Sequence, residues 1–198
     1  MNTYFNNKTH SMYVNLTLDE NSNDRVRIGI SPRDANGAYD TKNGVQVTLY
    51  KNSYKTTKEG QPNYRNVEVF VDAIKDIVKK YKNDDKDAPR QISCIYVNGI
   101  TSHTLQYAFG IVEKDGIVSY IMYLVDSFEE KSRKQVYRFR DNEELESFID
   151  MLKLFCDPWI HMCSHLVYSE MQNIINKSVG EQLQRIIREE FDRQQANS

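Results

Sequence analysis

The sequence predicts an α+β protein built from two tandem antiparallel strand-rich units, each followed by a helix, plus a C-terminal helical extension. Three observations lead to this fold class. Apolar and polar residues alternate in several short segments, which is the period of a strand with one buried face. In two places the alternation gives way to apolar residues at helical spacing. The order of elements in the first half then recurs in the second, without a residue-level repeat.

The first unit, residues 12–82, is expected to begin with three strands. They lie at 13–18, 25–31 and 45–50, and turn signals such as Asn43-Gly44 separate them. The side chains expected to face inward are Val14, Leu16, Val26, Ile28, Ile30, Val45, Val47 and Leu49.

Three further segments surround these strands. Residues 1–11 are expected to be a disordered start, and residues 51–66 a polar, basic loop. An amphipathic helix is predicted to follow and to end near Lys82, before the linker at 83–90. Its apolar face comprises Phe70, Ile74, Ile77, Val78 and Tyr81.

The second unit, residues 90–156, repeats this order. Asp141 or Asn142 is expected to cap its helix, whose apolar stripe runs from Leu145 to Phe155. The four strands before that helix are predicted at 91–97, 104–113, 117–126 and 135–140.

The two units and a closing helix are expected to form a single domain, residues 12–176. The closing helix would begin at Asp157-Pro158, a favourable cap and first-turn pair. Residues 177–198 are predicted to be a C-terminal helix and tail.

The composition indicates a protein without a membrane span. Of 198 residues, 39% are apolar and 27% charged, and the longest nearly apolar run, Gly116–Val125, is half of what a membrane helix needs. We expect no secretory signal, because Met1–His10 is polar. Three cysteines without paired spacing favour a reducing compartment. The expected location is the cytoplasm of a bacterium, or of the host if the protein is phage-encoded.

The net charge of −2 conceals a gradient along the chain. Residues 1–66 carry nine Lys and Arg against six Asp and Glu, a balance of +3. Residues 141–198 carry five against eleven, a balance of −6. A protein that is acidic overall can therefore still have a basic working face in its first third.

The outward parity of the predicted strands places tyrosines among arginines and lysines, on a sheet face and on the neighbouring loop. Cations neutralise phosphates and aromatic rings stack on unpaired bases, so this face is a candidate nucleic-acid interface. An ordinary solvated sheet face is the alternative. The candidate residues are Tyr13, Arg25, Arg27, Arg33, Tyr50, Lys51, Tyr54, Lys55, Lys58, Arg138 and Arg140.

Metal binding and catalysis have weaker support. Cys156, His161, Cys163 and His165 are zinc-ligand types, but Cys163 falls on a different helical face from the two histidines. The acidic cluster that includes Asp84 and Asp85 lies in a polar linker. No nucleotide-binding or catalytic fingerprint is present, so we expect neither a cofactor nor an enzyme.

Self-association has two candidate elements. Residues 117–125 are apolar on both parities, which is typical of a central strand or of an interface. The predicted helix at 179–191 has an apolar stripe without an assigned partner. Packing within the domain and assembly into an oligomer are both open.

The order of elements over residues 11–170 resembles the Whirly and Pur-type superfamily of single-stranded nucleic-acid-binding proteins. YVNLTLDENSNDRVRIGI (Tyr13–Ile30) is similar to the strand–turn–strand that begins a Pur-type repeat, and LKLFCDPWIHMCSHLVY (Leu152–Tyr168) resembles the helix–break–helix that closes a Whirly domain. The lysine- and glycine-rich motif of plant Whirly proteins is absent. The resemblance implies sequence-tolerant binding to single strands, assembly into dimers or tetramers, and no enzymatic activity.

The sequence therefore predicts a protein that binds single-stranded DNA, or RNA, through a basic, tyrosine-rich sheet face and loop. The alternative is a protein–protein interaction module, such as an accessory or inhibitor protein of a phage, that binds no nucleic acid. A metal-dependent nuclease that uses Asp84 and Asp85 is a third hypothesis.

Overall fold

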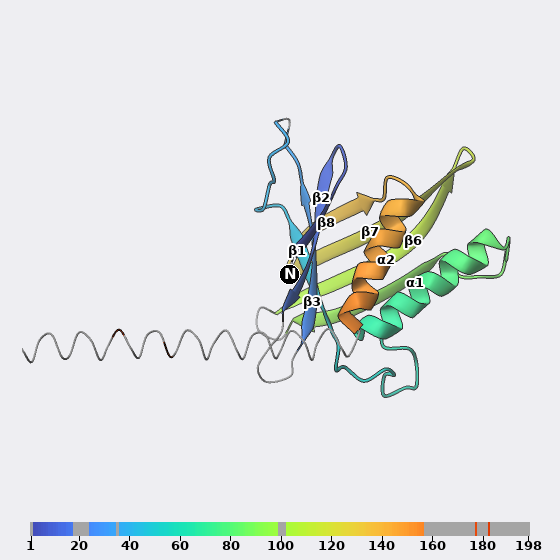
Figure 1. The fold of residues 1–198 in the computed structure, drawn as a ribbon, viewed down its shortest axis with the longest axis horizontal. Helices are drawn as coiled ribbons and strands as arrows, with labels where there is room; N and C mark the ends of the chain where they lie inside the picture. Colours follow the sequence, from blue (N-terminus) through green and yellow to red (C-terminus); the bar gives the residue numbers. More distant parts are fainter. Residues whose placement is uncertain are drawn as a thin grey trace, which may run out of the picture. The chain divides into compact units, whose positions relative to one another are not determined.

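The computed structural model describes residues 2–17, 24–34, 36–98, 102–156, 177 and 182, and the predicted fold class is confirmed. Two four-stranded antiparallel sheets are each followed by a helix (Figure 1). Sheet 1 and its helix comprise β1 (Asn2–Asn6), β2 (His10–Thr17), β3 (Arg25–Pro32), β4 (Val45–Tyr50) and α1 (Val67–Lys82). Sheet 2 and its helix comprise β5 (Gln91–Asn98), β6 (His103–Lys114), β7 (Ile117–Phe128), β8 (Lys131–Arg138) and α2 (Asn142–Cys156).

The chain divides into a compact part up to Cys156, which contains both sheets, and another part from Asp157 onward. The predicted closing helix at 157–176 and the apolar stripe at 179–191 lie outside the described residues.

The prediction of a disordered start at residues 1–11 is wrong. β1 pairs along β2, and the Phe5 side chain is buried against Phe148 of α2, with ring centroids 6.0 Å apart. A five-residue strand with one inward aromatic gives almost no periodic signal. Its stabilisation comes from edge pairing and from a contact with α2, more than 140 residues later in the sequence, neither of which is visible locally.

The apolar residues of the alternating segments face the core, as the sequence predicts. In sheet 1, Val14, Ile28 and Val47 are cross-strand neighbours and fully buried. In sheet 2, β7 lies between β6 and β8 and is therefore an interior strand. Its inward parity includes the buried Tyr120, Met122 and Leu124, while its outward parity belongs to the outer face of the sheet. β8 begins at Lys131, earlier than the predicted 135, because its first residues are polar yet still pair with the end of β7.

Each helix begins at a side-chain cap. Asn66 accepts a hydrogen bond from the Val69 N–H at 3.1 Å and begins α1. Asp141 accepts from the Glu144 N–H at 2.8 Å at the start of α2. The Glu144 side chain in turn accepts from the Arg140 N–H at 2.7 Å, one residue before the cap.

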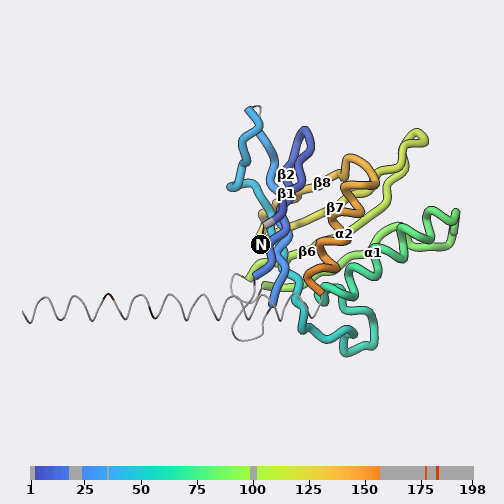
Figure 2. Tube along the Cα trace, viewed as in Figure 1, coloured from blue at the N-terminus to red at the C-terminus, as the bar shows by residue number. Residues whose placement is uncertain are grey.

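Both sheets and both helices contribute to one hydrophobic core. Phe70 of α1 packs edge-on against Tyr107 of β6, and Phe148 of α2 packs against Phe139. The two helices contact each other, and Figure 2 shows the path that brings them together. Because the apolar parity of sheet 1 is used in this core, its other face is available to solvent and to ligands.

Candidate nucleic-acid interface

The outer face of sheet 1 carries its arginines in cross-strand rows with neutral polar partners. Arg27 lies between Asn15 and Thr48, and Arg25 lies between Thr17 and Tyr50. None of these partners is acidic. Successive rows on one face are about 7 Å apart along a strand, so the two arginines form a short cationic track.

Tyr13 lies in the next row and is held flat across the sheet. Its cross-strand neighbour on β3 is Gly29, and a Cβ atom at that glycine would lie only 2.1 Å from the Tyr13 ring. The side chain therefore passes directly over Gly29, and its hydroxyl donates to the side-chain oxygen of Gln46 on β4. Burial raises the pKa of the Tyr13 hydroxyl, while the positive charge of Arg27 opposes that rise. The hydroxyl therefore remains a donor at neutral pH.

A third arginine, Arg65, stacks at the β4 edge of the same sheet. Its guanidinium lies 4.2 Å from the ring centroid of Tyr96 and 5.1 Å from that of Tyr50. The Tyr96 hydroxyl accepts a hydrogen bond from the Thr48 N–H at 3.0 Å, which ties β5 to the β4 edge. These contacts hold a cation between two aromatic rings beside the Arg25 row.

The loop at residues 51–66 is organised by one buried amide. Besides capping α1, the Asn66 side-chain nitrogen donates to the carbonyls of Lys51 and Ser53, at 3.1 and 2.7 Å. Tyr54 is 88% exposed on this loop. The loop is therefore held at its base and presents an aromatic ring to solvent.

The lysines of the loop differ in whether their ammonium groups are paired with a carboxylate. Lys55 forms a 2.7 Å ion pair with Glu68 of α1, and this hydrogen bond and charge raise the pKa of the lysine. Lys58 is exposed. Part of the charge that the sequence assigns to nucleic-acid binding is thus used within the protein.

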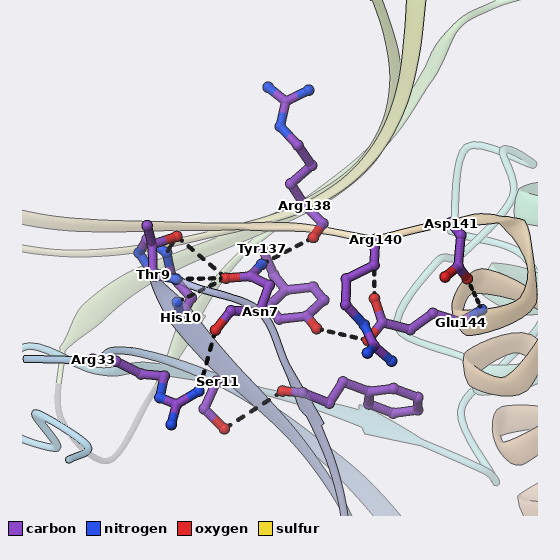
Figure 3. Close-up of polar contacts among 11 residues, drawn as sticks. Asn7, Thr9, His10, Ser11, Arg33, Tyr137, Arg138, Arg140, Asp141 and Glu144 are labelled. Atoms are coloured by element: carbon purple, nitrogen blue, oxygen red, sulfur yellow. Dashed lines mark hydrogen bonds and ion pairs between the residues drawn. The ribbon is translucent and has the colours of Figure 1, made fainter. Parts of the chain in front are cut away.

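Arg138 and Arg140 do not belong to the outer face of sheet 1, so the expectation that they share a face with Arg25 and Arg27 is wrong. Arg138 is on β8 of sheet 2, where its carbonyl accepts from Asn7 while its guanidinium points away (Figure 3). The Arg140 guanidinium pairs at 2.9 Å with the buried carboxylate of Glu144, which also accepts from the Tyr137 hydroxyl. The outward parity of Arg138 is correct, but the topology places it in the other sheet, and Arg140 lies just after β8.

Arg33 is also used within the fold. Its Nε atom donates to the Gly37 carbonyl at 3.1 Å, and its terminal nitrogen donates to the Asn7 carbonyl at 3.2 Å. Its guanidinium lies 5.9 Å from the ring centroid of Tyr39. Arg33 thus joins the β3–β4 loop to the β1–β2 turn and positions Tyr39.

Sequence reasoning missed a hollow of about 400 Å³ at this end of sheet 1. No local pattern indicates a binding role for Tyr4 or Tyr39, because Tyr4 lies in a short segment without clear alternation and Tyr39 lies in a turn. They become neighbours of Tyr13 only through the strand register and the loop fold. The lining residues are Tyr4, Ser11, Tyr13, Ser31, Tyr39 and Thr41.

The remaining candidate sites lie largely outside the described residues. His161, Cys163 and His165 are among the undescribed positions, while burial raises the pKa of the Cys156 thiol to about 11. Within the described part of the chain, no cluster of three or more His, Cys, Asp or Glu could hold a metal ion. Asp85 accepts from the Asp87 N–H within the turn that follows α1. No helix in the described ranges is long and apolar enough to span a membrane.

The comparisons with known proteins bear on the fold. No protein-family model and no curated protein matches this sequence. Among solved structures, the chain is similar to the crystal structure of WHY1 from Arabidopsis thaliana, a Whirly protein, with a TM-score of 0.50 and 6% sequence identity. The match covers 86% of this chain and 93% of that one. The resemblance predicted from the sequence is thereby confirmed for a Whirly-like fold, and at this identity for the fold alone.

Proposed function

We propose that this protein binds single-stranded DNA, without strong sequence preference, through the outer face of sheet 1 and the adjoining 51–66 loop. One observation carries the proposal. Arg25, Arg27 and Arg65 lie on or beside that face among tyrosine rings, and the cross-strand partners of the two strand arginines are neutral. The Whirly-like fold supports nucleic-acid binding in general terms.

The pairing of cations with exposed rings favours single strands over duplexes. Phosphates are attracted by arginine and lysine in either form of nucleic acid. The faces of bases, in contrast, are accessible for stacking only where the bases are unpaired. Tyr54 and Tyr4 expose 88% and 56% of their surface, which is more aromatic area than phosphate binding requires.

The test is a titration of a fluorescent oligo-dT of about 16 nucleotides, the upper end of common site sizes, over a salt series. Binding is expected to weaken steeply with salt. In the Arg25→Ala/Arg27→Ala variant, the slope of log affinity against log salt should fall by about 1.4, since each phosphate contact on a single strand contributes roughly 0.7. A duplex and a matching RNA oligonucleotide distinguish the nucleic-acid class.

Lys79→Ala/Lys82→Ala is the matched control. It removes the same charge from the exposed last turn of α1, away from the sheet face, and should leave the slope nearly unchanged. Absence of binding by the wild-type protein at about 50 mM salt contradicts the proposed function. Equal salt slopes for the wild type and the Arg25/Arg27 variant contradict phosphate binding by the sheet face. Binding by the loop at 51–66 would remain consistent with that result.

The second candidate, a protein–protein interaction module, is favoured by a different observation. Ile95 and Val97 of β5 are 63% and 64% exposed on the outer face of sheet 2. Recovery of one stoichiometric protein partner, insensitive to nuclease, together with no oligonucleotide binding would favour it. A homo-oligomeric state, dimer or tetramer, and the absence of enzymatic activity remain predictions.

A further inference from the structure

The tyrosine hollow on sheet 1 is built from three separate parts of the chain. Tyr4 comes from β1, Tyr13 from β2 and Tyr39 from the β3–β4 loop, and together they line a space of about 400 Å³. This volume lies within the usual range of small-molecule pockets. The three rings lie far enough apart in the sequence that only the folded sheet brings them together.

Tyr13 forms a fixed aromatic surface in this hollow. Its ring covers Gly29 on β3, and its hydroxyl is held by Gln46 on β4. An aromatic side chain laid over a glycine in the neighbouring strand is a recognised stabilising pair in sheets. Because both ends of the side chain are fixed, little conformational entropy would be lost when a planar ligand packs on it.

Tyr4 and Tyr39 form the sides. The rings of Tyr4 and Tyr13 are inclined at 49° with centroids 6.5 Å apart, so they diverge rather than pack face to face. Tyr39 is positioned by Arg33, which is itself tied to Gly37 and Asn7. Tyr4 and Tyr39 are 56% and 50% exposed, so the hollow is open to solvent on its aromatic side.

The other lining groups are hydroxyls. Ser11, Ser31 and Thr41 lie among the rings, and a hydroxyl can both donate and accept a hydrogen bond. Such groups satisfy the polar edge of any nucleobase without selecting one. Arg27 lies one row further along the same face, about 7 Å from Gly29, where a phosphate attached to a bound base would be neutralised.

We propose that this hollow binds one unpaired nucleobase, stacked on Tyr13 and enclosed by Tyr4 and Tyr39. The inference rests on the proposed function and names the subsite that would distinguish a single strand from a bare polyanion. It also assigns Arg33 the role of a positioning residue for Tyr39, in place of the phosphate contact expected from the sequence.

The experiment compares two ligands of equal length and charge: oligo-dT and an abasic chain that keeps every phosphate. Both are titrated against the wild type, Tyr4→Ser/Tyr39→Ser and Tyr4→Phe/Tyr39→Phe. The wild type should prefer oligo-dT by about 5- to 150-fold, the effect of stacking on one base. The serine variant should lose most of this preference while its affinity for the abasic chain is retained, and the phenylalanine variant should keep it.

The outcomes separate this inference from the proposed function. If the wild type binds neither ligand, the proposed function fails, and the inference fails with it. If the wild type binds both ligands equally, or the serine variant keeps the preference for oligo-dT, the base subsite is overturned and phosphate binding stands. A fall in affinity of the serine variant for both ligands alike also overturns the subsite, because it indicates damage to the sheet rather than loss of stacking.

Discussion

The two sheets have the same strand order, but their outer faces carry different side chains. Sheet 1 presents Tyr13, Arg25 and Arg27 among neutral polar neighbours. Sheet 2 presents mostly aliphatic side chains at the corresponding outward parity, and Ile95 and Val97 are more than 60% exposed. The outward cations of sheet 2 include Arg138, whose cross-strand neighbour is Ile121, and Lys134, which lies over the Tyr123 ring at 4.8 Å. The larger aliphatic residues of that face are Ile95, Val97, Val112, Ile117, Ile121, Val125 and Val136.

This difference shows which surfaces of the repeated arrangement are free to diverge. The inner faces of both sheets must fill one core, so they share the same apolar alternation. The outer faces are free of that constraint, and they place their cations differently: Arg25 and Arg27 of sheet 1 lie between neutral polar neighbours, whereas Arg138 of sheet 2 lies beside an aliphatic side chain. A fold shared with another protein at 6% identity therefore gives no information about which face is used.

The largest expected effect tests whether the ion pair of Arg140 with Glu144 in the second unit is structural. Glu144→Ala removes the acceptor of the buried Tyr137 hydroxyl and of the Arg140 N–H. We expect the free energy of unfolding to fall by about 1–3 kcal/mol, the cost of leaving a buried polar group unpaired. Urea denaturation followed by circular dichroism measures it, and oligo-dT affinity of the folded protein should be unchanged.

Arg27→Ala is the opposite case in the first unit. It should weaken oligo-dT binding while changing the free energy of unfolding by no more than about 0.5 kcal/mol, as for most surface substitutions. The contrast between the units is lost if Glu144→Ala weakens binding as much as Arg27→Ala does.

A pair of glycines gives an intermediate effect. Gly110 of β6 has room for a methyl group, because its Cβ would lie 3.6 Å from Ile121, an ordinary contact. Gly110→Ala should therefore raise the free energy of unfolding by about 0.5–1 kcal/mol through reduced chain entropy. At Gly29 the same change meets the Tyr13 ring at 2.1 Å. Gly29→Ala should gain no stability and should lower oligo-dT affinity, since Tyr13 must move.

Thermal denaturation and the same titration distinguish the two alanine variants. Equal stabilisation at both glycines, with oligo-dT affinity preserved, would show that Tyr13 does not depend on Gly29. The claim that Gly29 holds the Tyr13 ring in place would then be wrong.

The regular elements could be predicted because their signal is local. Alternation identified β2, β3 and β4, and helical spacing identified α1, within a few residues of their bounds. β1 could not be predicted, because its stabilising contact joins Phe5 to Phe148 of α2, which lies far along the sequence.

The placement of the candidate binding residues was also predicted in part, because strand parity is a local signal and sheet membership is not. Strand parity placed Tyr13, Arg25 and Arg27 on the outer face of sheet 1. Parity alone cannot say which sheet a strand joins, and so Arg138 was assigned to the wrong face. The ion pair of Arg140 with Glu144 had a local signal, because the two residues have the i, i+4 spacing of a helix-surface ion pair.

The smallest expected effect compares two surface ion pairs, one in each unit. Lys55 pairs with Glu68 at 2.7 Å beside the loop at 51–66, and Arg90 pairs with Glu113 at 3.2 Å in the second unit. Glu68→Gln should release the Lys55 ammonium for phosphate and steepen the salt slope of oligo-dT binding by up to about 0.7. Both pairs are exposed, so stability should change little.

Glu113→Gln is the matched control, since it removes the same charge and releases a cation in the second unit. It should leave the salt slope unchanged if phosphates contact only the first unit. If both substitutions steepen the slope equally, net charge rather than position governs the affinity. The assignment of binding to sheet 1 and its loop would then be contradicted, even if the protein binds single strands tightly.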